Sequence, residues 1–148
     1  MTHKRAMDRS AFIPEFFSHV DAKEFNWVKA QLADDCLIAD PGMCARGPQA
    51  VVDWMSSFMR AFPDMQHRPF QILADDDQAA FLIEITGNHT GSLALSDGNV
   101  LPPTGRALKL TISEFWKFTE GKVSEYRVIY DRIEFLAQIG IDAVPAAQ

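Results

Sequence analysis

The stretch ALKLTISEFWKF (residues 107–118) alternates apolar and polar side chains, and this alternation decides the fold class. Successive side chains of a strand point to opposite sides, so such a pattern predicts a β-strand with one buried face. Further strands are expected over residues 79–90 and 123–130, with a weaker one over 68–74. The second half of the chain therefore predicts an antiparallel sheet.

The first half of the chain predicts helices. Residues 12–20 repeat large apolar side chains at helical spacing. Asp21 has the residue type of an N-cap for a second helix, with Glu24 as its capping-box partner and an inner stripe that runs to Leu32. A third helix is expected over residues 48–62, because it opens on a proline and its apolar residues share one face.

Two shorter elements complete the pattern. The apolar run 36–39 predicts a strand before the third helix, and Asp131 can cap a final short helix. The chain therefore predicts a single α+β domain over residues 1–148, in which three N-terminal helices cover one face of a curved antiparallel or mixed sheet. A cone-shaped pocket is expected between the helices and the sheet.

Composition and charge restrict the partners. The 148 residues are 47% hydrophobic and 23% charged, which is typical of a globular domain. A net charge of −6 disfavours nucleic acid, and the one basic stretch, residues 3–5, predicts a frayed tail. No apolar run approaches the roughly 18 residues of a membrane span. Cys36 and Cys44 follow no secretory segment, so we expect reduced thiols in a cytoplasmic protein.

Glu114 is the strongest candidate for chemistry that the residues themselves indicate. It is the only ionisable residue on the apolar face of the strand over 107–118. A carboxyl group on such a face has a raised pKa, and it can serve as a general acid or as a protonated donor to an oxyanion. The alternatives are an ordinary ion pair with Arg127 or another base, or a strand face that is less buried than its pattern indicates.

His89 and Asp40 are two further candidates. His89 shares a face with Phe81, Ile83 and Ile85, where an imidazole could transfer protons; the alternative is a structural hydrogen bond to a loop carbonyl. Asp40 follows a short apolar strand, where it could be a general base; the alternative, which the sequence favours, is a simple Asp-Pro turn.

Glu125 leaves two interpretations open. Parity in the strand over 123–130 puts it on a face with Val123, Arg127 and Ile129. It is either an acid/base in the pocket or a surface partner of Arg127. Parity alone does not separate the two.

Metal and cofactor sites lack sequence support. The four histidines show no ligand spacing, and no Gly-rich phosphate loop or Gly-x-Ser-x-Gly motif is present. We therefore expect neither a metal nor a cofactor.

Several motifs together resemble the SnoaL-like polyketide cyclase family over nearly the whole chain. They include His89-Thr90-Gly91, the run Pro-Pro-Thr-Gly-Arg at 102–106, Gly-Lys-Val-Ser-Glu at 121–125, and Asp131 followed by a glutamine and a glycine. The resemblance implies a nuclear transport factor 2-like cone, a homodimer formed through the sheet, and cofactor-independent ring closure by aldol condensation. It also implies that Glu125 is the acid/base, with support from His89.

A more distant resemblance is to ketosteroid isomerase, through Asp40-Pro41 and through Glu114 near that family's oxyanion-hole acid. The tyrosine of that site would be replaced here by Phe16 or Phe17. Both resemblances imply that a proton is removed beside a carbonyl group of a small apolar ligand. The alternatives are an isomerase or dehydratase and a non-catalytic ligand-binding module. The side chains expected to contact the ligand are Phe16, Trp54, Phe58, Ile112 and Trp116.

Overall fold

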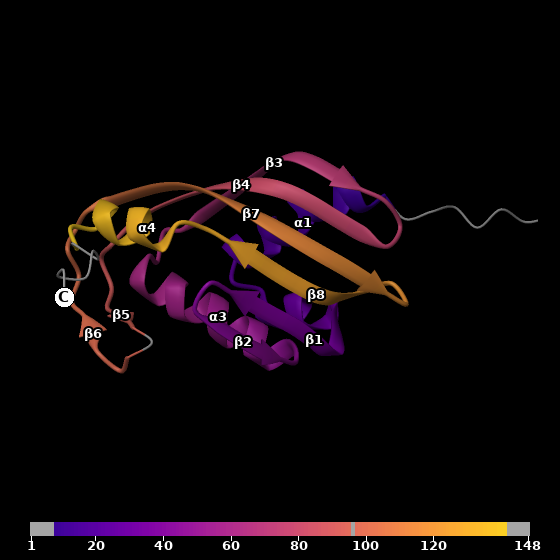
Figure 1. The fold of residues 1–148 in the computed structure, drawn as a ribbon, viewed down its shortest axis with the longest axis horizontal. Helices are drawn as coiled ribbons and strands as arrows, with labels where there is room; N and C mark the ends of the chain where they lie inside the picture. Colours follow the sequence, from indigo (N-terminus) through magenta and orange to yellow (C-terminus); the bar gives the residue numbers. More distant parts are fainter. Residues whose placement is uncertain (1–7, 96, 142–148) are drawn as a thin grey trace, which may run out of the picture.

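The computed structural model describes residues 8–95 and 97–141, and it shows four helices and a strongly curved sheet (Figure 1). The helices are α1 (Arg9–Asp21), α2 (Phe25–Ala30), α3 (Pro48–Ala61) and α4 (Arg132–Gln138). The main strands are β1 (Leu32–Asp40), β2 (Met43–Arg46), β3 (Gln66–Ala74), β4 (Gln78–Asn88), β7 (Ala107–Thr119) and β8 (Lys122–Ile129). The short pair β5 (Leu93–Ala94) and β6 (Val100–Leu101) forms a separate ribbon.

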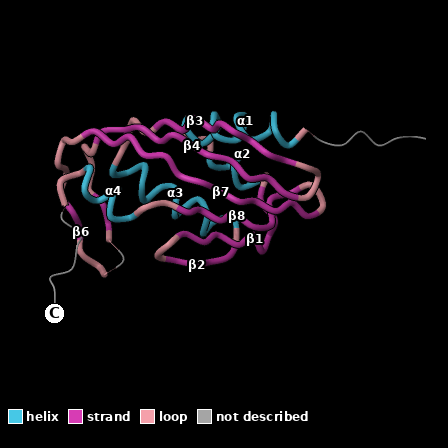
Figure 2. The backbone as a smooth tube through the Cα atoms, turned by 45° about the horizontal axis from the view of Figure 1, so that its top comes forward, coloured by secondary structure: helices cyan, strands magenta, loops and turns pink. Residues whose placement is uncertain are grey.

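The six main strands form one mixed sheet in the order β2-β1-β8-β7-β4-β3. Every neighbouring pair is antiparallel except β1 and β8, which run parallel. Helices α1, α2 and α3 lie on one side of this sheet, as Figures 1 and 2 show. The predicted α+β class and the curved mixed sheet are confirmed. The helices match less closely, because β1 and β2 come between α2 and α3, and a fourth helix, α4, follows the sheet in the described part of the chain. The final helix is also confirmed, because the Asp131 side chain accepts a hydrogen bond from the backbone N–H of Glu134 at 3.0 Å.

Two local predictions were wrong. Asp21 does not cap α2: it is the last residue of α1, and its carboxylate accepts hydrogen bonds from the backbone and ring of His67. Glu24 takes the N-cap position of α2, but its side chain makes no capping hydrogen bond to that helix. Leu32 begins β1 rather than continuing α2, and there it pairs with Val123 of β8.

The alternation in β7 corresponds to burial. Leu108, Leu110, Ile112, Glu114, Trp116 and Phe118 are all buried, and the residues between them are exposed or half-buried. Their buried face packs on an aromatic cluster in which Phe16 meets the Trp116 ring at 4.8 Å. The sheet thus supplies the floor of the core, and the helices close it from one side.

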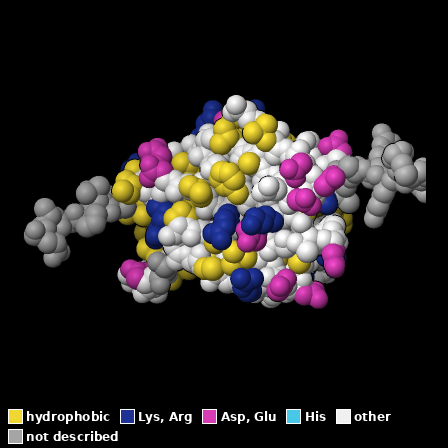
Figure 3. All heavy atoms as spheres, turned by 45° about the vertical axis from the view of Figure 1, so that its right-hand side comes forward, with side chains coloured by type: hydrophobic (Ala, Val, Ile, Leu, Met, Phe, Trp, Pro, Cys, Tyr) yellow, Lys and Arg dark blue, Asp and Glu magenta, His cyan; other side chains and the backbone are white. Residues whose placement is uncertain are grey.

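The opposite face of the sheet meets solvent. Leu73, Phe115 and Ile129 are exposed large apolar residues, and the strand pairing puts them on that outer face. Figure 3 shows a view of the molecule in which apolar side chains lie among charged side chains of both signs. Dimerisation through the sheet stays a prediction. Cys36 is buried and Cys44 is exposed, and both are free thiols.

Candidate functional site

An apolar hollow, here called the inner cavity, lies between the helices and the inner face of the sheet. Its lining comes from α1, α3, α4 and four strands, and it includes Trp54, Met55, Phe58, Met59, Met65, Ile112 and Phe135. The space not filled by atoms is ≈ 580 Å³, part of it open solvent, and the space open to the centre of a water molecule is ≈ 50 Å³. The cavity is therefore narrow. Three methionines in its wall, which are flexible side chains, give it room to adapt.

Glu114 projects into the inner cavity from the middle of β7 and is 1% exposed. The indole N–H of Trp116 donates a hydrogen bond of 2.9 Å to its Oε1, and the Tyr126 side chain is also hydrogen bonded to the carboxyl group. No cation forms an ion pair with it among the described residues, so the expected alternative of a pair with Arg127 does not occur. Burial raises the pKa of Glu114 to about 8, and the two hydrogen bonds oppose that rise.

Tyr126 completes this polar group, and no local sequence pattern indicates that it does. It is 1% exposed, lines the inner cavity, and its own pKa is raised by burial and by the neighbouring Glu114. A β-bulge accounts for its position. Lys117 pairs with Glu125 but Phe118 pairs with Val123, so Ser124 is an extra residue that reverses the alternation in β8.

The same bulge turns Glu125 away from the cavity. Its side chain is 29% exposed, and its Oε2 lies 3.6 Å from Arg127 Nε and 3.8 Å from Lys117 Nζ. Of the two interpretations left open, the geometry corresponds to the surface ion pair. The structure does not bring Glu125 together with Glu114.

His89 lies just past the end of β4 and is fully buried, but it is not part of the cavity lining. Its Nδ1 accepts from the backbone N–H of Thr104 at 3.2 Å and lies 2.9 Å from the Thr104 hydroxyl. Backbone bonds join His89 to Arg106 and to Gly105 on the same loop. Burial lowers the pKa of His89. The residue thus holds the 102–106 loop with a neutral ring whose Nε2 has no partner among the described residues.

Asp40 lies at a second, wider hollow, here called the outer hollow, which shares Trp54, Phe58, Tyr130 and Phe135 with the inner cavity. Its Oδ2 accepts from the Trp54 indole at 2.8 Å, and its Oδ1 accepts from the Gly42 backbone at 2.7 Å. Both carboxylate oxygens are therefore engaged, one by the backbone of a turn and the other by a side chain that lines the outer hollow. The structure does not place Asp40 among the residues that line the inner cavity.

The five expected ligand contacts divide into two groups. Trp54, Phe58 and Ile112 line the inner cavity. Phe16 and Trp116 are buried in the aromatic cluster behind it, where Trp116 holds Glu114 in place.

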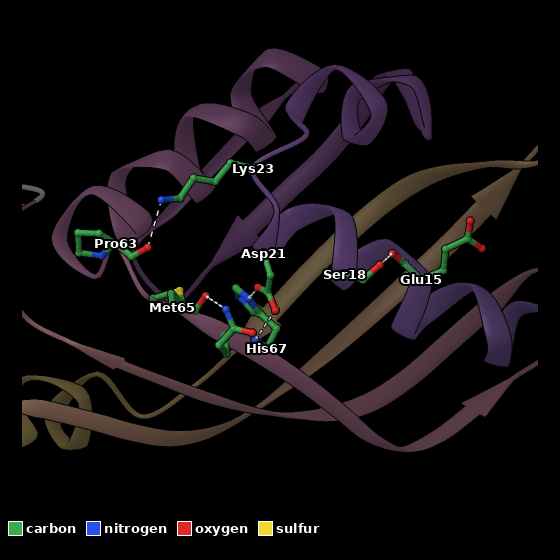
Figure 4. A network of polar contacts seen from close by, with 8 residues as sticks. Glu15, Ser18, Asp21, Lys23, Pro63, Met65 and His67 are labelled. Atoms are coloured by element: carbon green, nitrogen blue, oxygen red, sulfur yellow. Dashed lines mark hydrogen bonds and ion pairs between the residues drawn. The ribbon is translucent and has the colours of Figure 1, made fainter.

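The cavity wall holds an ionisable pair that no sequence pattern indicates as a site. His67 on β3 lines the inner cavity, and its Nδ1 lies 2.6 Å from Oδ1 of Asp21 at the end of α1 (Figure 4). The partners are 46 residues apart in the chain, and no local motif links them. Only the contact of α1 with β3 brings them together.

The described residues show neither a metal-binding cluster nor a membrane-spanning helix. Residues 8–95 and 97–141 contain no group of three or more His, Cys, Asp or Glu side chains arranged to hold a metal ion. None of the helices in that part of the chain has the length and apolarity to cross a bilayer.

The fold and the cavity define an α+β cone of the nuclear transport factor 2-like kind. The family model for SnoaL-like polyketide cyclase matches residues 11–139, so the chain belongs to this family. The resemblance found in the sequence motifs is thereby confirmed. No protein with a curated description is detectably similar in sequence.

Solved structures share the fold at low identity. A provisionally named SnoaL-like polyketide cyclase from Jannaschia sp. CCS1 has a TM-score of 0.80 at 13% identity, over 98% of this chain and 100% of the other. IdmH, provisionally named a polyketide cyclase, from Streptomyces antibioticus, has a TM-score of 0.75 at 22% identity, over 91% and 100%. AclR from Streptomyces galilaeus, provisionally named a hydroxylase, has a TM-score of 0.75 at 22% identity, over 96% of this chain and 87% of the other. At these identities the likeness concerns the fold alone.

Proposed function

We propose that this protein binds a small apolar carbonyl compound in the inner cavity and promotes its enolisation, the step that begins an aldol ring closure. The proposal rests on Glu114: its carboxyl group lies in an apolar cavity, and burial raises the pKa of that group to about 8. At neutral pH such a group is mostly protonated, so it can donate a hydrogen bond to a carbonyl oxygen.

The geometry around Glu114 supports stabilisation of an oxyanion. The carboxyl group and the Tyr126 hydroxyl lie together in a cavity with little access to water, where a hydrogen bond to a developing negative charge is strong. The Trp116 indole fixes one oxygen of the carboxyl group, and the Tyr126 side chain is hydrogen bonded to the same group. Membership of the SnoaL-like polyketide cyclase family supports the ring-closing version of this chemistry.

A ketosteroid isomerase-like reaction is the second candidate, and the Tyr126–Glu114 contact favours it. The sequence predicted that a phenylalanine of the first helix replaces the tyrosine of that site, but a tyrosine reaches the acid from β8 instead. Both candidates need the same first step and differ in what the enolate does next.

The test uses α-tetralone, a two-ring apolar ketone, as the probe. Binding to the full chain is expected to lower the carbonyl stretching frequency, and the protein should accelerate exchange of the C2 protons in D₂O. Glu114→Leu should remove the frequency shift and reduce exchange by about 10²-fold or more, the usual effect of losing one oxyanion donor. Near-ultraviolet circular dichroism verifies that the variant keeps its packing.

Glu125→Leu is the matched comparison, because it removes a carboxylate of the same size from the outer face. We expect it to keep both signals. If Glu125→Leu instead abolishes exchange while Glu114→Leu retains it, the acid/base role belongs to Glu125, as the family resemblance implies.

A further inference from the structure

The Asp21–His67 pair fixes which ring nitrogen of His67 carries the proton. A carboxylate oxygen can only accept, so Nδ1 donates its N–H to Oδ1 of Asp21 across 2.6 Å. The second carboxylate oxygen accepts the backbone N–H of the same residue, His67, at 3.0 Å. With both donors on one residue, the carboxylate holds the imidazole in the tautomer whose Nε2 has a free lone pair.

The ring is held firmly, and Nε2 remains available. Phe17 stacks on the imidazole with its centroid 5.2 Å away and the planes 24° apart. The side chains of His67 and Asp21 are only 11% and 14% exposed. Among the described residues nothing is hydrogen bonded to Nε2, and the atom is not sealed from solvent as Nε2 of His89 is.

The register of the sheet relates His67 to Glu114. His67 pairs with Ile85 of β4, which pairs with Leu110 of β7, and Glu114 lies four residues further along the same face. In a flat sheet this offset would separate the two Cα atoms by about 16 Å. Both side chains project into one cavity of a curved sheet, so the gap between imidazole and carboxyl group is shorter. The proposed step needs both groups within hydrogen-bond reach of one O=C–C–H unit of the ligand, so it is the convergence of the two side chains in the cavity that matters.

We propose that Nε2 of His67 is the general base that removes the proton beside the ligand carbonyl, with Asp21 as its positioning residue. This inference rests on the proposed function of the cavity. In the step, Nε2 forms a bond to the proton, and the C–H electron pair becomes the C=C bond of the enolate. The carbonyl π pair moves to oxygen, which is hydrogen bonded by Glu114. The imidazolium is stabilised by the Asp21 carboxylate until it returns the proton.

A purely structural role for the pair is the competing explanation, and two contacts weaken it. Lys23 Nζ donates to the Pro63 carbonyl at 3.1 Å, so the end of α1 has another tie to the segment before β3 (Figure 4). The backbone N–H of His67 also keeps Asp21 in place whatever the side chain. The imidazole ring is therefore not needed to attach α1 to the sheet.

The experiment measures two signals of α-tetralone with the full chain: the carbonyl stretching frequency and the exchange of C2 protons in D₂O. His67→Gln should reduce exchange by about 10²-fold or more, the range of general-base catalysis, and should leave the carbonyl shift intact. Asp21→Asn should lower kcat with little change in KM, because an amide can donate to Nδ1 and so put the proton on Nε2. Added imidazole should restore exchange in His67→Ala.

His19→Gln is the matched control, since His19 also pairs with a carboxylate, Glu24 at 3.1 Å, but outside the cavity. It should exchange as the wild type does. Undiminished exchange in His67→Gln overturns the base assignment and leaves the proposed function standing. Loss of the carbonyl shift in His67→Gln, without rescue of His67→Ala by imidazole, shows a structural role and also overturns it. A wild-type protein that gives neither signal overturns both proposals.

Discussion

The indole N–H of Trp116 donates a 2.9 Å hydrogen bond to Glu114, which lies two residues earlier on the same face of β7. The Tyr126 side chain, from the neighbouring strand, bonds to the same carboxyl group. Both groups stabilise the ionised carboxylate, whereas burial disfavours it. Burial wins, because the carboxyl group is 1% exposed and has no cation beside it among the described residues.

Because burial raises the pKa of Glu114 and its hydrogen bonds lower it, Tyr126→Phe is expected to raise this pKa further above its ordinary value. Loss of the hydroxyl removes one stabilising bond from the ionised form, and the rest of the ring stays in place. A ¹³C NMR titration of the glutamate side-chain carboxyl carbons measures the change. Tyr130→Phe is the matched control, because Tyr130 lines the same cavity without a hydrogen bond to Glu114, and it should leave the titration unchanged. A lower pKa in Tyr126→Phe would contradict this account.

The raised pKa of Glu114 also predicts a pH-dependent contribution to stability. Between the unfolded value of 4.5 and the folded value of about 8, the native state keeps a proton that the unfolded chain has lost. The free energy of unfolding contributed by this group is therefore highest below pH 4.5 and falls by about 1.4 kcal/mol per pH unit across that window. Above the folded value the loss is complete.

Glu114→Gln isolates this contribution, because the amide has a similar shape and does not titrate. Urea unfolding at several pH values should show the stability of the variant, relative to wild type, rising from pH 5 to pH 8. Glu84→Gln is a suitable comparison, since Glu84 pairs with Arg68 on the outer face at 3.0 Å. A wild-type-minus-variant difference for Glu114→Gln that does not change with pH would show that Glu114 titrates as an ordinary carboxyl group.

Much of the fold and the central acid could be predicted from local patterns. Alternation over residues 107–118 identified both β7 and the inward direction of Glu114, because period-2 patterning reports the buried face directly. The helices followed from spacing and from the proline at the start of α3. The parallel pairing of β1 with β8 could not be predicted this way, since it joins residues 88 to 91 positions apart through the tertiary structure alone.

The other residues of the site depended on features that a local pattern does not show. One extra residue, Ser124, reversed the faces of β8, so Tyr126 turned inward and Glu125 outward. Asp21 has the sequence context of a helix cap, but α1 packs against β3, and the Asp21 carboxylate is therefore hydrogen bonded to His67 instead. In both cases tertiary contacts overrode a correct local rule.

A substitution at Gly91 tests how tightly the loop after β4 packs against α3, the helix that carries Trp54 and Phe58 of the cavity. Its backbone N–H donates to the Ala61 carbonyl at 3.0 Å, and a Cβ at this position would lie 1.9 Å from the carbonyl oxygen of Arg60. That oxygen belongs to the backbone and cannot rotate away, so Gly91→Ala must displace the loop or the end of α3. We expect a loss of about 3 kcal/mol in unfolding free energy, at the upper end of overpacking effects. A protein of this length should then melt roughly 10 °C lower.

Gly42→Ala is the control, because its Cβ would meet only the flexible guanidinium of Arg132 at 3.2 Å, and its melting temperature should change little. Equal melting temperatures for Gly91→Ala and wild type would mean that the loop and α3 separate easily, and the cavity wall would then be far less rigid than its contacts indicate.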